Sequence, residues 1–150
     1  MIRSAIDETS AVDVANRLRP VLLRLSRELR REIETLGITS RQATLLWLIR
    51  EHPGLNLREL AALERISAPA LSGHVDRLER AGLIERVRSG DDRRRVGLVL
   101  TGDGARLLRR VRARRTSWLA ERIEALDPDE IEAIERAVEP LQRLLAEDGA

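Results

Sequence analysis

The spacing of apolar residues follows a helical period along almost the whole chain and changes to a strand pattern only once. Leucine and isoleucine recur every three or four residues from Leu18 to Leu36, and the same spacing returns in 102–126 and 128–147. Between residues 83 and 100 the period is two, which is typical of strands. The 150-residue chain is therefore predicted to be mainly α with one small β-hairpin.

Short polar motifs mark where the predicted helices begin. In three places an N-cap residue is followed three positions later by a glutamate or glutamine, which together form a capping box. These pairs are Thr39 with Gln42, Asn56 with Glu59, and Asp127 with Glu130. Pro20 interrupts the first helix, predicted over 11–36, and is expected to start or kink it locally. Gly37 supplies a stop.

Two short helices with a tight join are predicted over 57–64 and 68–80, with Ser67 as the N-cap of the second. Their lengths and the join are those of a helix-turn-helix. Two strands, 83–88 and 96–100, follow directly, and a charged turn over 89–95 joins them. A helix-turn-helix followed by such a hairpin is a winged helix, here flanked by long helices.

The basic residues are all arginine, and their distribution is uneven. Residues 58–115 hold fifteen arginines and eight acidic residues, whereas residues 121–150 hold three arginines and ten acidic residues. A basic middle beside an acidic tail is typical of a nucleic-acid binder with a separate assembly region. A GC-rich genome and an ordinary solvated surface would give a similar composition. Arginine keeps its charge at cellular pH and offers forked donors to phosphates.

The composition excludes several classes of protein. Without cysteine there can be no disulfide, thiol nucleophile or cysteine-ligated metal site. No uncharged run exceeds ten residues, whereas a membrane helix needs roughly 20, and no secretory signal is predicted at the N-terminus. A small helical enzyme finds little support, because tyrosine is absent and the two histidines lie apart. We expect a cytoplasmic protein with no cofactor and no membrane partner.

A run of residues from the second helix of the helix-turn-helix to the start of the long helix has a recognisable order. It comprises Leu71-Ser72, Val75-Asp76-Arg77-Leu78-Glu79, Gly82-Leu83-Ile84, Asp92-Arg93-Arg94, Leu100-Thr101 and Gly104. This order resembles the multiple-antibiotic-resistance regulator (MarR) family. The Asp-Arg-Arg of the wing, followed at a fixed distance by Leu-Thr, is its most specific part. The resemblance covers essentially the whole chain.

The resemblance implies a homodimeric transcription regulator, usually a repressor, that binds double-stranded DNA and is released by a small-molecule effector. Residues 1–38 would form an N-terminal dimerisation helix and residues 39–101 the winged helix-turn-helix DNA-binding domain. Residues 102–150 would form a connecting helix and a C-terminal dimerisation helix. Two-fold symmetry implies a pseudo-palindromic operator with half-sites about one DNA turn apart.

The outward face of the helix over 68–80 is predicted to enter the major groove. Alanine and proline can contact a thymine methyl group, and serine can donate or accept a hydrogen bond. Gly73 departs from relatives, which often carry a larger polar residue there. The predicted DNA contacts of this segment are Ser67, Pro69, Ala70, Ser72, Gly73, His74 and Arg77, the last placed for a phosphate.

The wing prediction centres on Arg94. In the family pattern the second arginine of Asp-Arg-Arg enters the minor groove, and the aspartate, here Asp92, braces it through a salt bridge. A guanidinium suits a narrow, electronegative groove. Arg93 and Arg95 are predicted to meet the flanking backbone. Arg86, like Arg88 and Arg65, is a candidate for a phosphate contact, with a merely solvated arginine as the equal alternative.

Trp47 and Trp118 are the only aromatic residues. The family implies an effector pocket where the helices over 11–36, 39–50 and 102–126 meet the winged domain, and both tryptophans are assigned to it; a core position is the alternative for each. No metal site is predicted. Two other functions stay open: a winged-helix interaction module without DNA binding, and a metal-responsive regulator.

Overall fold

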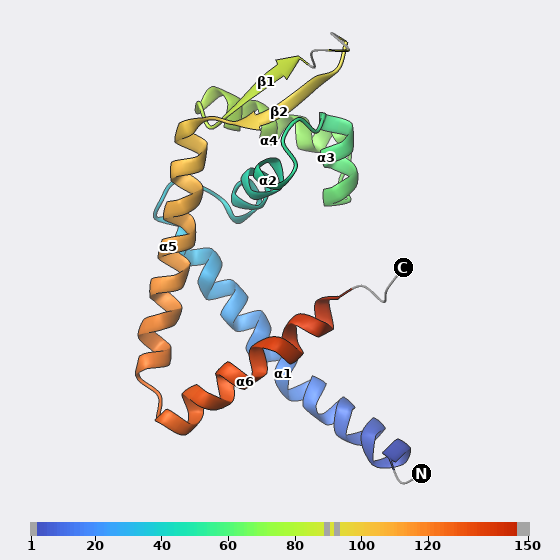
Figure 1. Cartoon of the computed structure of the whole chain (residues 1–150), viewed down its shortest axis with the longest axis vertical. Coiled ribbons are helices and arrows are strands. Elements are labelled where there is room, and N and C mark those ends of the chain that lie inside the picture. The colour runs from blue at the N-terminus through green and yellow to red at the C-terminus, as the bar shows by residue number, and fades with distance from the viewer. Residues whose placement is uncertain (1–2, 89–90, 92–93, 147–150) are drawn as a thin grey trace. The chain divides into compact units, whose positions relative to one another are not determined.

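The computed structural model describes residues 3–88, 91 and 94–146 and shows a mainly helical chain with one antiparallel hairpin (Figure 1). This confirms the predicted fold class. The elements are α1 (Arg3–Glu34), α2 (Ser40–Glu51), α3 (Leu57–Glu64), α4 (Ala68–Arg80), β1 (Ile84–Arg88), β2 (Val96–Leu100), α5 (Gly102–Glu124) and α6 (Pro128–Leu145). Contacts divide the chain into two compact units, residues 1–114 and 115–150.

The first helix begins earlier than the sequence predicted and does not start at Pro20. α1 runs from Arg3 through Pro20 to Glu34. Proline removes one backbone donor, but its fixed φ suits a helix, so a long helix can continue past a single lost hydrogen bond. Gly37, with φ +74°, follows the end of α1 as predicted.

The predicted caps are found, with one difference. The Thr39 hydroxyl accepts from the backbone N–H of Gln42, and the Gln42 side chain accepts from the N–H of Thr39. Asn56 accepts from the N–H of Glu59 at 2.8 Å, but this second capping box is incomplete. The Glu59 carboxylate instead pairs with Arg95 across the fold. A partner distant in sequence therefore replaces the local one.

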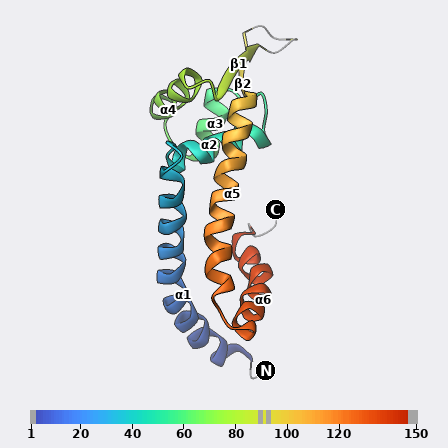
Figure 2. The ribbon, with the colours of Figure 1, turned by 90° about the vertical axis from the view of Figure 1, so that its left-hand side faces the viewer.

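The buried core of the first unit joins the end of α1, all of α2, α3 and α4, the hairpin and the start of α5 (Figure 2). α2 contributes its apolar residues as predicted, except that Trp47 is 47% exposed. α4 buries one stripe at helical spacing. The fully or nearly fully buried side chains are Ile33, Ile38, Ala43, Leu45, Leu46, Leu48, Ile49, Leu60, Ala61, Leu71, Val75, Leu78, Ile84, Leu98, Leu108 and Val111.

β2 forms hydrogen bonds on both of its edges. On one edge it pairs with β1, with Ile84 opposite Leu100 and Arg86 opposite Leu98. On the other edge, the N–H of Gly54 donates to the carbonyl of Leu98, and the N–H of Leu98 donates to the carbonyl of Leu55, both at 2.9 Å. The turn after α2 thus pairs with the edge of β2 that β1 leaves open.

The start of α5 is fixed against the turn between α4 and β1. The Thr101 hydroxyl donates to the carbonyl of Gly82 at 2.6 Å, and it accepts from the N–H of Gly104 at 3.1 Å. Gly104 lies so close to the carbonyl of Leu83 that a Cβ at this position would collide with it. The Leu-Thr and Gly of the recognised run therefore hold the start of α5 in close contact with the turn between α4 and β1.

The second unit contains the end of α5 and all of α6. The Arg122 guanidinium lies 3.8 Å from the centroid of the Trp118 ring, and Trp118 is buried. The Glu130 carboxylate accepts from the N–H of Asp127 at the start of α6. None of the residues of α6, all of which the structure describes, is buried. Among the described residues, no helix has the length and apolar character needed to cross a bilayer.

Candidate nucleic-acid interface

The residues of α4 that are predicted to reach DNA lie outside its buried stripe. Ser67 caps the helix by accepting from the N–H of Ala70 at 3.3 Å, and Pro69 lies in the first turn, where its missing N–H has no partner to lose. Ser67, Pro69, Ala70 and Arg77 are exposed, and Ser72, Gly73 and His74 are partly exposed. The N-terminal half of α4 is thus a surface of small side chains.

Arg77 lies along its own helix. Its Nε donates to the carbonyl of Gly73 at 3.1 Å, one turn earlier. A Cβ at Gly73 would stand 3.6 Å from Nη2 of Arg77, which is an ordinary contact. The exposed guanidinium keeps donors for an anion such as a DNA phosphate.

Arg86 is held by two carboxylates of α4, which the sequence did not indicate. Its Nε donates to Oε2 of Glu79 and its Nη2 donates to Oδ1 of Asp76, each at 3.0 Å. Two sequence features agree with these partners but do not single them out: the three-residue spacing of Asp76 and Glu79, and the alternation of β1, which places Arg86 on the face of buried Ile84. The predicted phosphate contact of Arg86 stays untested; two of its five N–H donors are engaged here.

The wing carries the predicted minor-groove residue at an exposed position. Arg94 is exposed, close to the start of β2. Asp92 and Arg93 lie outside the described residues, so their predicted roles stay predictions. Arg95 forms an ion pair with Glu59 at the start of α3. This pair ties the wing to the helix-turn-helix and was missed by sequence reasoning, which had assigned Glu59 to a local cap.

A close approach of two glycines supports the base of the wing. A Cβ at Gly97 would collide with the backbone of Gly54, whose φ is +90°. Both positions therefore exclude larger residues, Gly97 by space and Gly54 by conformation. A small hollow of about 270 Å³ lies beside them, lined also by Val87, Arg88 and Arg95.

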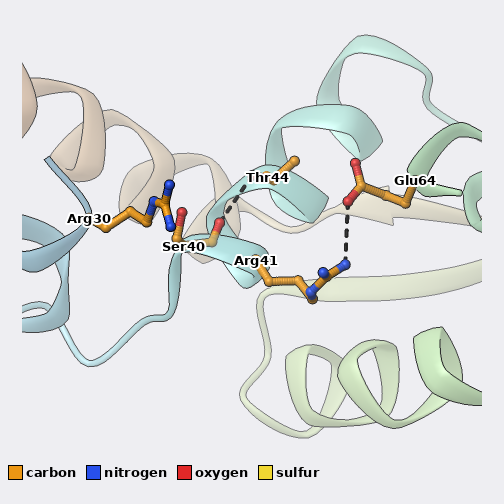
Figure 3. Close-up of a pocket in the computed structure, with 5 residues that line it drawn as sticks. All are labelled: Arg30, Ser40, Arg41, Thr44 and Glu64. Carbon is orange, nitrogen blue, oxygen red and sulfur yellow. Dashed lines mark hydrogen bonds and ion pairs between the residues drawn. The ribbon is translucent and has the colours of Figure 1, made fainter. Parts of the chain in front are cut away.

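A polar pocket of about 340 Å³ lies where α1, α2 and α3 meet (Figure 3). Arg30 comes from α1, Ser40, Arg41 and Thr44 from α2, and Glu64 from α3. Arg41 and Glu64 form an ion pair with an N–O distance of 3.6 Å. The pocket thus offers two guanidinium groups, with one carboxylate in competition for them.

Neither tryptophan lines this pocket. Trp47 is about half exposed on α2, and Trp118 belongs to the second unit, so their shared role in an effector pocket stays a prediction. Within the described residues, no group of three or more histidine, cysteine, aspartate or glutamate side chains is placed to hold a metal ion.

Comparisons with known proteins identify the family of the chain. The model of the MarR family matches residues 38–96. A solved MarR family protein from Bacillus stearothermophilus is 26% identical, with a TM-score of 0.78, and the match covers 93% of this chain and 98% of that chain. The chain belongs to the MarR family.

Two further proteins are similar to this chain. The HTH-type transcriptional regulator FarR of Neisseria gonorrhoeae is 39% identical over 71 residues, which are 47% of this chain and 49% of that protein, so the match spans about half of each. A mutant MepR of S. aureus, solved bound to an oligodeoxyribonucleotide, is 22% identical with a TM-score of 0.69, covering 88% of this chain and 97% of that chain. This MarR family protein is a DNA-binding winged-helix transcription regulator and not an enzyme.

Proposed function

We propose that this MarR family protein is a cytoplasmic homodimeric repressor that binds a pseudo-palindromic operator and is released by a small anionic effector. The observation that carries the proposal is the pairing of an exposed face of small side chains on α4 with an exposed wing arginine, Arg94, in one compact unit. Major-groove and minor-groove contacts by one winged domain read base edges and groove width together.

Uncovered apolar side chains on the terminal helices support the dimer. Soluble monomers rarely leave long apolar stripes exposed, because such surface associates in water. α1 and α6 both carry such stripes, and each helix repeats the apolar positions every three or four residues. The exposed large apolar residues are Val12, Val14, Val21, Leu22, Leu23 and Leu25 on α1, and Ile134, Val138, Leu144 and Leu145 on α6.

The pocket between α1, α2 and α3 supports an anionic effector. Arg30 and Arg41 supply guanidinium groups, which bind carboxylates or phosphates with two parallel hydrogen bonds. An anion bound to Arg41 would compete with Glu64, the last residue of α3, and so release the contact between α2 and α3. Because α3 packs on α4, this competition would reach the DNA-binding surface.

Selection of duplexes from random DNA with the purified protein tests operator binding. We expect a pseudo-palindrome with half-sites about one turn, roughly 34–36 Å, apart. Sedimentation of the same protein should give twice the 17.0 kDa chain mass. A protein that enriches no sequence, although folded, would be an interaction module without DNA binding.

Competition with small anions tests the effector. Carboxylates and phosphates of increasing size are added to the protein bound to its selected duplex, and release is measured by fluorescence anisotropy. Arg41→Gln should abolish release by the active anion. Arg50→Gln is the matched control, because Arg50 lies on the same helix and pairs with its neighbour Glu51 outside the pocket. Equal loss of release in both variants would contradict the site.

A further inference from the structure

Arg86 joins the first strand of the wing to the helix that is proposed to enter the major groove. It lies two residues after the buried Ile84, so both side chains are on the face of β1 that packs on α4. Its Nε and Nη2 donate, at 3.0 Å each, to Glu79 and Asp76. These two acidic residues stand three positions apart on α4 and therefore on one side of the helix.

We propose that Arg86 is a positioning residue that sets the orientation of α4 relative to the wing, and that it is not a phosphate contact. The inference rests on the proposed operator recognition. A guanidinium is a rigid planar fork, and here the two donors on one side of it are each taken by a different carboxylate. Such a group resists rotation of α4 against β1 more than a single ion pair does.

The exposure of the three side chains limits how this contact can act. Arg86, Asp76 and Glu79 are 38%, 44% and 40% exposed, so water screens the attraction and each pair adds little to stability. We expect the contact to act by fixing the orientation of α4 relative to the wing. Simultaneous entry of α4 into the major groove and of Arg94 into the minor groove requires a fixed relation between helix and wing, because a small misplacement loses one contact or the other.

Arg88 provides a matched comparison on the same strand. It lies two residues beyond Arg86, is exposed, and forms no ion pair within the described part of the chain. Replacing either arginine by glutamine removes one positive charge from β1. A residue that only attracts phosphates should weaken binding to every DNA sequence equally, whereas a positioning residue should weaken binding to the operator selectively.

The first experiment measures Arg86→Gln and Arg88→Gln on two duplexes, the one selected with the wild-type protein and a scrambled duplex of equal composition. Arg86→Gln should weaken operator binding about tenfold and leave the affinity for scrambled DNA within the change seen for Arg88→Gln. The salt dependence of Arg86→Gln should equal that of the wild type. Equal loss on both duplexes, with a flatter salt dependence, would overturn the proposal.

Two further variants separate charge from geometry. Arg86→Lys keeps the charge but holds only one carboxylate well, so it should lose most of the specificity that Arg86→Gln loses; near-normal operator binding would indicate a phosphate contact. The double variant Arg86→Glu with Glu79→Arg keeps the net charge and restores one bridge. It should recover operator binding relative to Arg86→Glu alone, and the absence of recovery would contradict a positioning role.

The outcomes also distinguish this inference from the proposed function. If the wild-type protein selects no duplex, operator recognition itself fails. If it selects a duplex that Arg86→Gln and Arg86→Lys bind as the wild type does, only the positioning role fails. Thermal melting of each variant shows whether it is folded, and the melting temperature should stay close to that of the wild type, because these positions are exposed.

Discussion

The winged domain and the two terminal helices treat their apolar residues differently. α4, a helix of 13 residues, buries Leu71, Val75 and Leu78. α6 has 18 residues and a regular apolar face, yet none of them is buried, and of residues 11–34 of α1 only Ile33 is buried. Helices gain most of their stability from packing an apolar face. The winged domain supplies its own packing surface, whereas the proposed dimer would supply the surface that covers the terminal helices.

The largest effect is expected when a second chain can no longer cover the apolar face of α6. Val138→Arg places a charge in the exposed apolar face of α6, where Val138 is 49% exposed. A charge that cannot be paired opposes burial in an interface, so the variant should be monomeric in sedimentation. A monomer contacts one half-site and loses the effective concentration of the second, so operator affinity should fall by about 100-fold or more.

Ala133→Arg is the control for this variant. Ala133 is an exposed residue of the same helix and lies outside its apolar series. The added charge is equal, but the dimer and operator binding should persist. A wild-type protein that sediments as a folded monomer at micromolar concentration would remove the contrast between the two regions.

The second prediction concerns the self-sufficiency of the winged domain. Gly97→Ala forces a Cβ against the backbone of Gly54 and separates the turn from β2. Overpacking of this kind typically costs about 1–3 kcal/mol, which should appear as a lower melting temperature. The oligomeric state of the folded variant should be unchanged, because the wing is not part of the proposed interface. An unchanged melting temperature would mean that the turn moves away freely.

The third prediction concerns an exposed residue of the winged domain. Arg94→Ala should weaken operator binding by about 1–2 kcal/mol and lower the slope of the salt dependence by about 0.9 per subunit, because a cationic contact with DNA is lost. Stability should change by no more than about 0.5 kcal/mol. Asp92→Ala should give a smaller loss of affinity, since it removes the proposed brace, and Arg94→Lys should restore binding only in part.

Arg136→Ala is the charge-matched control, because Arg136 lies on α6, where it pairs with Glu132. Fluorescence anisotropy at two salt concentrations compares the four variants with the wild type. If Arg136→Ala and Arg94→Ala lose the same affinity, only net charge matters and the wing has no specific role.

The smallest effect is expected from oxidants and chelators. The chain contains no cysteine, and its one methionine is Met1. Peroxide and a metal chelator should therefore leave operator binding unchanged within error. Loss of binding that dithiothreitol reverses, or that added metal restores, would mean that a second component of the regulator has been overlooked.

Local signals predicted the elements well, and contacts between distant segments were not predictable from them. Periodicity and N-caps such as Thr39 and Ser67 depend on residues within one turn, so the sequence displays them directly. The pairing of Glu59 with Arg95 joins residues 36 positions apart, and many carboxylates could have met that arginine. Trp47 lies in a run of buried residues and yet faces outward, because which side of an almost wholly apolar helix meets the core depends on the tertiary packing.

In the candidate site too, local features were predictable from the sequence and contacts between distant segments were not. The exposed face of α4 follows from its buried stripe, so the proposed groove-facing residues could be named in advance. The engagement of Arg86 by two carboxylates could not, because it depends on how β1 crosses α4. The resemblance supplied roles for Asp92 and Arg94 that spacing alone would not have given.

The close contact at Gly104 limits where this chain can be spliced to the chain of a relative in a chimera. Gly104 fits against the carbonyl of Leu83 only because it has no side chain, and Thr101 fastens the same place to Gly82. A chimera spliced between residues 101 and 102 would separate surfaces that must match. A splice after residue 114, at the boundary between the two compact units, keeps this contact intact. It transfers the wing together with the first turns of α5, which pack against it.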